Sequence, residues 1–240
     1  MIFLQLSDMP CARLLRVMRS FVTQFRQQGL RAMLRAMTDR CFVRWFEWRF
    51  GIRSESVIEL KELGLENQFY RPYVPTDYRS FLKVLDALPI KPGEDSFLDF
   101  GSGLGRAVIL AATRPFRRVV GVEIAPQLNT AARENVRRAL PRLICRDIEL
   151  VTIDATQFAI AGDIAVIYFF NPFAGEVLAR VLANVRESLR AKPRSLRLIC
   201  KIPAQSAFEE EIRQHKWLVT ERELVFDANS RYLFLTAEVE

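Results

Sequence analysis

The chain has 240 residues, half of them hydrophobic and 26% charged, which is the size and composition of one folded domain with room for an appendage. Its four cysteines lie far apart, without a C-x-x-C pair, and it has a single histidine. These counts argue against a zinc site and against a disulfide framework, so we expect no metal and a reducing, cytoplasmic location. No run of 18 apolar residues occurs, so no transmembrane helix is predicted.

The positive charge is concentrated near the N-terminus. Residues 1–53 contain ten arginines and three acidic residues, which accounts for the whole formal net charge of +7. Between residues 11 and 27 the apolar side chains fall on one helical arc and the arginines on the other. A second basic segment, rich in aromatic residues, follows at 31–50. We therefore expect residues 1–67 to form a basic amphipathic helical extension.

The role of this extension has three interpretations. A basic amphipathic helix is typical of contact with an anionic membrane, an acidic partner or nucleic acid, so residues 11–50 predict peripheral membrane contact and a membrane-associated location. The same pattern is typical of a surface helix whose apolar face docks on the main domain. A removed mitochondrial targeting segment is the third interpretation, although the stretch is poor in serine.

From about residue 68 the pattern changes to alternating strands and helices. Thr76 is expected to cap a helix over 77–88, which Pro89 ends. Apolar runs predict five strands, and helical patterns lie between or after them: strands at 96–100, 118–124, 148–153, 164–170 and 195–202, helices at 105–114, 126–139, 174–190 and 206–214. Two further runs, 217–226 and 231–239, flank a turn and predict a hairpin. The expected fold of residues 68–240 is α/β: a doubly wound, mostly parallel seven-stranded sheet with a C-terminal antiparallel hairpin.

Three glycines follow the first predicted strand at alternate positions. Gly101, Gly103 and Gly105 open a helix and allow a tight turn that a ligand can approach closely. A dinucleotide-binding pattern would need glycine at position 106, but that residue is Arg106. Asp99 precedes the turn, and its carboxylate would repel a pyrophosphate and attract an ammonium group. The motif therefore disfavours a nicotinamide dinucleotide.

Acidic residues also follow the next two predicted strands. Glu123 ends the second strand, where its carboxylate can accept both hydroxyls of a ribose. Asp154 follows the third strand and can accept from an adenine amino group, with the Ala155 N–H as a donor. Carboxyl ends of parallel strands meet at one edge of a sheet, so these groups are expected to share one site. An ammonium, a ribose and an adenine together describe S-adenosylmethionine.

The segments FLDFGSGLGRAVILAA, VVGVEIAP, IDAT and IYFFNPF resemble the class I, seven-strand S-adenosylmethionine-dependent methyltransferases. The resemblance covers about residues 70–240, and the C-terminal hairpin is similar to that family's antiparallel last strand. It implies S-adenosylmethionine as the cofactor and a set of cofactor contacts at matching motif positions. These are Tyr73, Thr76, Asp99, Gly101, Ser102, Gly103, Gly105, Glu123, Asp154, Ala155 and Asn171.

The triplet Asn171-Pro172-Phe173 after the fourth strand bears on the methyl acceptor. Amine-directed methyltransferases often carry Asp/Asn-Pro-Pro-aromatic there, and this chain has one proline fewer. FFNPFAG is similar to the Asn-x-Phe-Ala of histone-lysine methyltransferases of the disruptor-of-telomeric-silencing type. Tyr73-Val74-Pro75 is similar to a motif of lysine methyltransferases related to the one that modifies mitochondrial ATP synthase subunit c. The resemblance implies a protein-lysine acceptor, with Asn171, Pro172, Phe173 and Tyr73 as catalytic residues.

An amine acceptor also has a physical basis. The nitrogen must arrive neutral, and a dry pocket walled by Tyr73, Phe170 and Phe173 would penalise an ammonium and attract the methylammonium product. Residues 54–240 carry no net charge, which argues against a nucleic-acid groove there. Two alternatives stay open. One is methylation of RNA, DNA or a small molecule, and the other is a non-catalytic binding module on the same fold.

Overall fold

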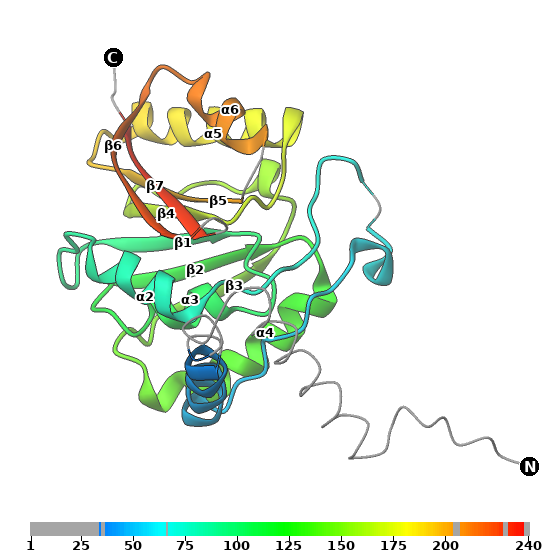
Figure 1. Cartoon of the computed structure of the whole chain (residues 1–240). Helices are drawn as coiled ribbons and strands as arrows, with labels where there is room; N and C mark the ends of the chain where they lie inside the picture. Colours follow the sequence, from blue (N-terminus) through cyan, green and yellow to red (C-terminus); the bar gives the residue numbers. More distant parts are fainter. Residues whose placement is uncertain (1–33, 35–36, 66, 204–206, 228–229, 238–240) are drawn as a thin grey trace, which may run out of the picture. The chain divides into compact units, whose positions relative to one another are not determined.

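The structure is a computed structural model that describes residues 34, 37–65, 67–203, 207–227 and 230–237. The chain divides into two compact units, residues 1–49 and residues 50–240 (Figure 1). The expected boundary was at residue 67, so residues 50–67 lie in the second unit. Within the described residues, no helix has the length and apolarity needed to cross a membrane.

In the first unit the described residues from 37 onward are helical. The rings of Phe42 and Trp45 lie 5.7 Å apart, and those of Phe42 and Phe46 lie 6.3 Å apart. Aromatic side chains three or four positions apart meet on one face of a helix, which explains the cluster. The amphipathic pattern at 11–27 lies outside the described residues, so its helix stays a prediction.

The second unit is built on one seven-stranded sheet with the order β3-β2-β1-β4-β5-β7-β6. The first five strands are parallel, and the last two form an antiparallel hairpin in which β7 pairs with β5. The strands are β1 (Ser96–Phe100), β2 (Arg118–Glu123), β3 (Ile148–Thr152), β4 (Ile164–Phe169), β5 (Arg197–Ile202), β6 (Leu218–Asp227) and β7 (Ser230–Ala237). The predicted α/β fold, with its seven strands and terminal hairpin, is confirmed.

Helices cover both faces of the sheet (Figure 1). One face carries α2 (Tyr78–Asp86), α3 (Arg106–Ala111) and α4 (Pro126–Ala139), and the other carries α5 (Gly175–Ala191) and α6 (Ala207–Arg213). Strands β1, β4 and β5 are buried along almost their whole length, and most of their residues are apolar because both faces of each strand are covered. One described core cluster joins these strands to α5 and α6.

The N-terminal boundary of α2 corrects one expectation. Asp77, rather than Thr76, caps this helix, and its side chain accepts a hydrogen bond from the Ser80 amide at 2.8 Å. Threonine and aspartate are both good caps, so residue type alone does not select between Thr76 and the neighbouring Asp77. Thr76 is buried and its hydroxyl instead lies 3.3 Å from the Tyr168 hydroxyl.

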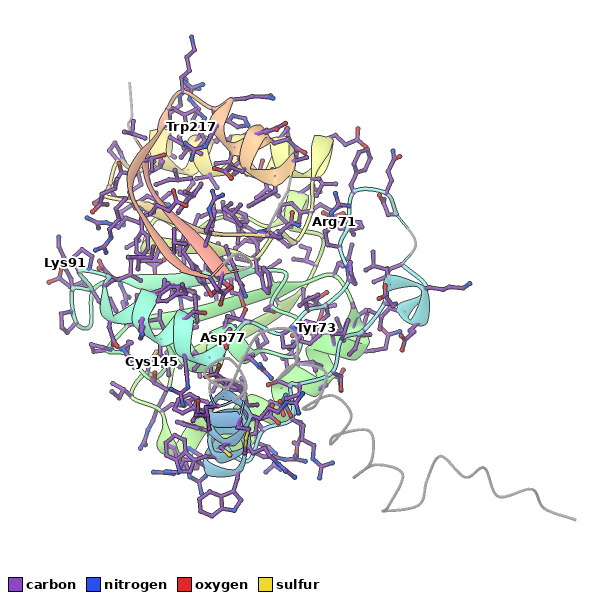
Figure 2. All side chains as sticks on the ribbon, viewed as in Figure 1. Arg71, Tyr73, Asp77, Lys91, Cys145 and Trp217 are labelled. Carbon is purple, nitrogen blue, oxygen red and sulfur yellow. The ribbon has the colours of Figure 1, made fainter. Side chains whose placement is uncertain are left out.

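The amino and carboxyl ends of the parallel strands lie on opposite sides of the molecule. Lys91 and Cys145, which precede β1 and β3, lie on one side of the molecule in Figure 2. Arg71 and Tyr73, which line the cavity described below, lie on the other side. The carboxyl ends of the strands therefore lie on the side of the cavity.

Candidate active site

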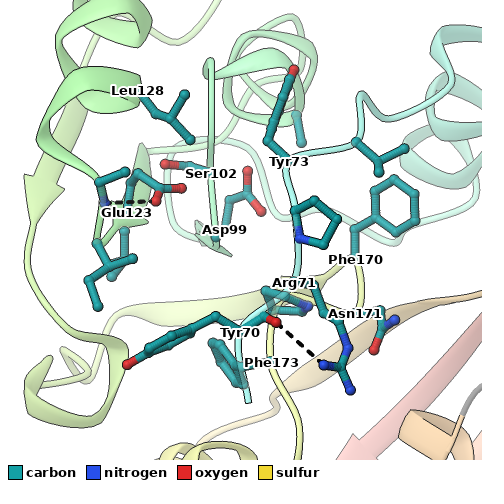
Figure 3. Close-up of a pocket in the computed structure, with 18 of the residues that line it drawn as sticks. Tyr70, Arg71, Tyr73, Asp99, Ser102, Glu123, Leu128, Phe170, Asn171 and Phe173 are labelled. Atoms are coloured by element: carbon teal, nitrogen blue, oxygen red, sulfur yellow. Dashed lines mark hydrogen bonds between the residues drawn. The ribbon is translucent and has the colours of Figure 1, made fainter. Parts of the chain in front are cut away.

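A cavity of about 550 Å³ opens at the carboxyl ends of the parallel strands. Ligands bind at this edge of open α/β sheets, and small-molecule sites typically enclose roughly 300–1,000 Å³. Figure 3 shows Glu123 and Leu128 at one end of the cavity and Phe170 and Asn171 at the other. We call these the acidic end and the aromatic end, with Asp99 included in the acidic end.

The glycine turn after β1 has the left-handed backbone that its sequence implied. The φ angles of Gly101, Gly103 and Gly105 are 74°, 53° and 79°, which only glycine adopts readily. A Cβ on Gly101 would lie 2.6 Å from Pro172, and one on Gly103 would lie 2.1 Å from the Tyr73 ring. The turn therefore exists to let neighbouring segments approach closely.

The backbone amides of this turn are used inside the protein. Gly101 and Ser102 both donate to the Val122 carbonyl, at 2.9 and 3.0 Å. Gly103 donates to Glu123 Oε2 at 2.8 Å. The turn thus offers a ligand close approach rather than free N–H donors. Its remaining polar group is the buried Ser102 hydroxyl, which has no hydrogen-bond partner among the described residues.

Asp99 is a buried carboxyl group that lines the cavity. It is 3% exposed, and none of the described residues forms a hydrogen bond or ion pair with it. Burial, and secondarily the nearby charge of Glu123, raise the pKa of Asp99 well above its ordinary value. A buried carboxylate is costly unless a cation accompanies it. Asp99 is therefore placed to receive a positively charged part of a ligand.

Glu123 is held rigidly at the end of β2. Its Oε2 accepts from the Gly103 amide at 2.8 Å and its Oε1 from the Ala125 amide at 2.9 Å. Burial raises the pKa of Glu123, and these backbone donors partly offset that effect. Each carboxylate oxygen has a further lone pair, so the group can still accept two hydroxyls. This arrangement suits a ribose.

Asp154 has partners that the sequence did not reveal. Its Oδ1 accepts from the Thr156 amide at 2.8 Å and caps a short 3₁₀ helix (Ala155–Gln157), while its Oδ2 accepts from the Tyr70 hydroxyl at 2.9 Å. Burial opposes ionisation of Asp154, but these hydrogen bonds outweigh it and hold its pKa below the ordinary value. Burial and the contact with Asp154 raise the pKa of Tyr70 to about 12. Asp154 does not line the cavity, whereas Ala155 does.

The Asn171-Pro172-Phe173 triplet forms the aromatic end. Asn171 has a φ of 44°, a left-handed conformation that asparagine tolerates better than most residues. No described residue forms a hydrogen bond with its amide, and the residue lines the cavity. Phe173 is buried beside Phe100 and Phe169. The strained backbone is held by this packing, and such strain is common at functional sites.

A segment from residue 54 to residue 76 covers the cavity. Tyr73 pairs with Ile58 through two backbone hydrogen bonds, and its hydroxyl donates to the Ser54 carbonyl at 3.0 Å. Arg106 fastens both ends of the segment, since its guanidinium donates to the Ser54 hydroxyl at 2.8 Å and to the Thr76 carbonyl at 3.0 Å. Arg106 stands where a dinucleotide-binding motif would have its third glycine, and here it holds the covering segment in place.

Ten of the predicted site residues line the cavity together and three do not. The ten are Tyr73, Thr76, Asp99, Gly101, Ser102, Glu123, Ala155, Asn171, Pro172 and Phe173. Gly103 and Gly105 instead pack against Tyr73 and α4, and Asp154 lies behind the wall. The first group was predicted from strand ends and motifs, and the structure brings it to one place.

Two sets of lining residues were missed. Leu60, Leu63 and Leu65 lie on the covering segment and form an apolar wall. Their spacing follows neither a helix nor a strand for long enough to be recognised. Lys201 lines the cavity from the end of β5. A lysine inside the apolar run RLICKI was the available signal, because a buried strand rarely carries a charge without a reason.

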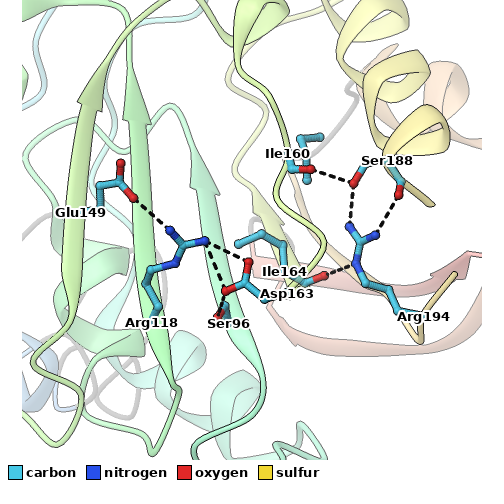
Figure 4. Close-up of polar contacts among 8 residues, drawn as sticks. All are labelled: Ser96, Arg118, Glu149, Ile160, Asp163, Ile164, Ser188 and Arg194. Atoms are coloured by element: carbon cyan, nitrogen blue, oxygen red, sulfur yellow. Dashed lines mark hydrogen bonds and ion pairs between the residues drawn. The ribbon is translucent and has the colours of Figure 1, made fainter. Parts of the chain in front are cut away.

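The opposite edge of the sheet holds polar contacts of a structural kind (Figure 4). Asp163 accepts from the Ser96 hydroxyl at 2.8 Å and from the Arg118 guanidinium at 2.9 Å. Arg118 also reaches Glu149 at 3.2 Å, so one arginine ties the starts of β2, β3 and β4 together. These groups fix the strands whose other ends carry the cavity.

Comparisons with known proteins agree with this geometry. Residues 97–192 match a protein family described as a methyltransferase domain. Among solved structures, the pyocyanin biosynthetic protein PhzM is similar with a TM-score of 0.53 at 17% identity, covering 66% of this chain and 54% of that one. A precorrin-6y C5,15-methyltransferase from Geobacter metallireducens GS-15 gives 0.51 at 15% identity, covering 67% and 87%. No curated protein sequence matches the chain.

A third structure, the ribosomal protein L11 methylase from Lactobacillus delbrueckii subsp. bulgaricus, has a TM-score of 0.50 at 16% identity and covers 66% of this chain and 77% of its own. These likenesses are fold-level. Together with the family match they define the class: the second unit is a class I methyltransferase fold. The family match over residues 97–192 and this fold support an S-adenosylmethionine-dependent methyltransferase.

The residues present fit this cofactor. Asp99 is an unpaired carboxyl suited to the ammonium group, Glu123 has lone pairs for the ribose, and Ser102 has a buried hydroxyl without a described partner. Ile124 and Leu128 give the acidic end an apolar wall for the base. Among the described residues no group of three or more His, Cys, Asp or Glu is arranged to hold a metal.

Proposed function

We propose that this methyltransferase methylates a nitrogen, that of a protein lysine or another amine. The observation that carries the proposal is Asn171. Its amide lines the cavity without a hydrogen-bond partner among the described residues, in a left-handed backbone between Phe170 and a wall of half-buried Pro172 and buried Phe173. An amide oxygen in this position can accept a hydrogen bond from the acceptor N–H and aim the nitrogen lone pair.

The chain's own residues account for binding, orientation and exclusion of water. When bound, the cofactor supplies an electrophilic methyl group on a sulfonium. The acidic end holds and orients its charged and ribose portions, and residues 54–76 cover the cavity. At the aromatic end, Tyr73, Phe170 and Phe173 disfavour an ammonium by desolvation and attract a methylammonium through their ring faces. Alignment and a dry cavity are the main requirements of methyl transfer.

The test uses methyl-labelled cofactor and a cell lysate. Labelled material is divided into samples for protease and nuclease treatment, and protein-bound label is hydrolysed to amino acids. Label in methyl-lysine supports the proposal. Label that nuclease removes, or that stays in small molecules, would replace it with methylation of nucleic acid or a metabolite. A protein that binds the cofactor and transfers no label would be a non-catalytic binding module.

A matched variant tests the role of Asn171. Asn171→Gly keeps the left-handed backbone and removes the amide, so the rate of transfer should fall by more than cofactor affinity does. The rate should fall about 5- to 150-fold, because a lost buried hydrogen bond costs about 1–3 kcal/mol. An unchanged rate would contradict the assignment.

We further propose a cytoplasmic location with peripheral membrane contact through residues 11–50, and a protein substrate in preference to nucleic acid.

A further inference from the structure

Lys201 is a buried lysine in the wall of the active-site cavity. It lies in β5, next to its carboxyl end, is 5% exposed, and lines the cavity together with Phe170 and Asn171. Its Nζ lies 4.0 Å from the centroid of the Phe170 ring and 5.9 Å from that of Tyr232. The amine is thus held at the aromatic end, beside the residues that would receive the methyl acceptor.

The surroundings of Lys201 do not neutralise its charge by direct contact. Asp77, before α2, and Asp227, at the end of β6, favour the charged form from a distance, and Arg106 of α3 disfavours it. No described carboxylate lies within ion-pair distance of Nζ, and no described acceptor hydrogen-bonds to it. Burial is the largest influence and lowers the pKa of Lys201 to about 8. A neutral amine is therefore accessible near physiological pH.

We propose that Lys201 is a catalytic residue that removes a proton from the acceptor ammonium before methyl transfer. The proposal rests on the proposed amine function and adds a base to it. Lysines with lowered pKa values are recognised general bases. Two amines in one dry cavity cannot both stay protonated without mutual repulsion, so an arriving ammonium and Lys201 share a single proton.

The proton transfer is balanced within the cavity. One N–H bond of the acceptor ammonium breaks, its electron pair stays on the acceptor nitrogen, and the proton forms a bond with the lone pair of Lys201 Nζ. That nitrogen lone pair then forms the new N–C bond while the electron pair of the breaking C–S bond passes to sulfur. Lys201 returns its proton to water when the product leaves. The charged lysine beside a methylammonium product also favours release by repulsion.

Competitive acetylation of the wild-type enzyme tests the titration of Lys201 without any acceptor. The extent of acetylation at each lysine is followed by mass spectrometry from about pH 6 to pH 11. Lys201 should reach half-maximal reactivity near pH 8, whereas a lysine in an unstructured reference peptide does so near about pH 10.4. A midpoint for Lys201 equal to that of the reference peptide would overturn the proposal.

Transfer of labelled methyl groups to a peptide digest of lysate protein tests the catalytic role. At about pH 7, Lys201→Met should lower the rate at least about 100-fold, the lower range for loss of a general base. The deficit should shrink to a few-fold near pH 10, where the acceptor loses its proton without help. Lys201→Arg keeps the charge but not the base, and should be as slow as Lys201→Met. Cofactor affinity, measured by calorimetry, should stay within about twofold.

Each other outcome has a definite meaning. A rate loss that is equal at all pH values, or a matching loss of cofactor affinity, would make Lys201 a structural residue and overturn the proposal. A Lys201→Arg variant with the wild-type rate would do the same. If the wild-type enzyme binds the cofactor but labels no amine in the digest, the proposed function fails, and the role of Lys201 fails with it.

Discussion

Replacement of Asp99 by asparagine isolates one charge in the cofactor site. Asn keeps the size of the side chain and removes its ability to ionise. Asp99 is buried and has no cationic partner among the described residues, so a bound ammonium is the group that would complete it. Removal of one member of a buried charge pair costs about 2–5 kcal/mol, which is roughly 30-fold to a few thousand-fold in affinity.

The ligands themselves supply controls. S-adenosylmethionine and S-adenosylhomocysteine both carry the ammonium group, so calorimetry should show both weakened by Asp99→Asn to a similar degree. Methylthioadenosine lacks the amino-acid portion, and its affinity should be unchanged. The exposed Asp147→Asn serves as a matched variant at the other edge of the sheet and should alter none of the three. Equal weakening of methylthioadenosine would refute the assignment of Asp99 to the ammonium.

The same variant should change stability in the opposite direction. The folded-state pKa of Asp99 is raised, so the unfolded chain ionises first and the ligand-free protein loses stability as pH rises through that range. Asparagine cannot ionise, so the Asp99→Asn variant does not lose stability in this way as pH rises. The melting temperature of ligand-free Asp99→Asn should therefore exceed that of the wild type at neutral pH and approach it at acidic pH. Cofactor affinity of the wild type should rise with pH over the same range, because binding favours the carboxylate.

Three further predictions concern other parts of the chain. Gly93→Ala measures the cost of a left-handed alanine alone, about 1–2 kcal/mol of unfolding free energy, because its Cβ would meet no atom within 4 Å. Gly103→Ala should lower the free energy of unfolding by clearly more, because its Cβ would clash with the Tyr73 ring. Adding Tyr73→Ala to Gly103→Ala should remove the excess. Asp163→Asn should lower the free energy of unfolding by about 1 kcal/mol at neutral pH, and urea titrations should show this difference disappear as acid protonates the wild-type carboxyl, whose pKa is lowered. Reversing three arginines within 11–27 to glutamate should abolish flotation with anionic liposomes, since each basic residue contributes about 1 kcal/mol at such a surface; equal flotation would reject the membrane contact.

The acidic end of the site could be predicted because its signals are local. Asp99 and Glu123 each end a short apolar run, and parallel strands place their carboxyl ends at one edge. The fold itself followed from the alternation of strands and helices. For the same reason the hairpin was visible as two alternating runs near the C-terminus.

The missed features depend on contacts between distant residues. Tyr70 and Asp154 lie 84 positions apart, and no pattern in the sequence near either residue predicts their hydrogen bond. The apolar wall of residues 60–65 belongs to a segment with little regular structure, which periodicity cannot detect. Lys201 is a single charge near the end of a strand, and only the cavity shows what it faces. Adjacent candidates for one role, as at the start of α2, are separated only by geometry.

The charges in the cavity favour release of the product rather than the transfer step itself. Carboxyl groups gather at the acidic end, and a lysine without a direct counter-ion lies at the aromatic end. Methyl transfer to an amine moves positive charge from sulfur to the acceptor nitrogen, which is away from the carboxyl groups and towards the lysine. The product is then repelled where the neutral acceptor was tolerated.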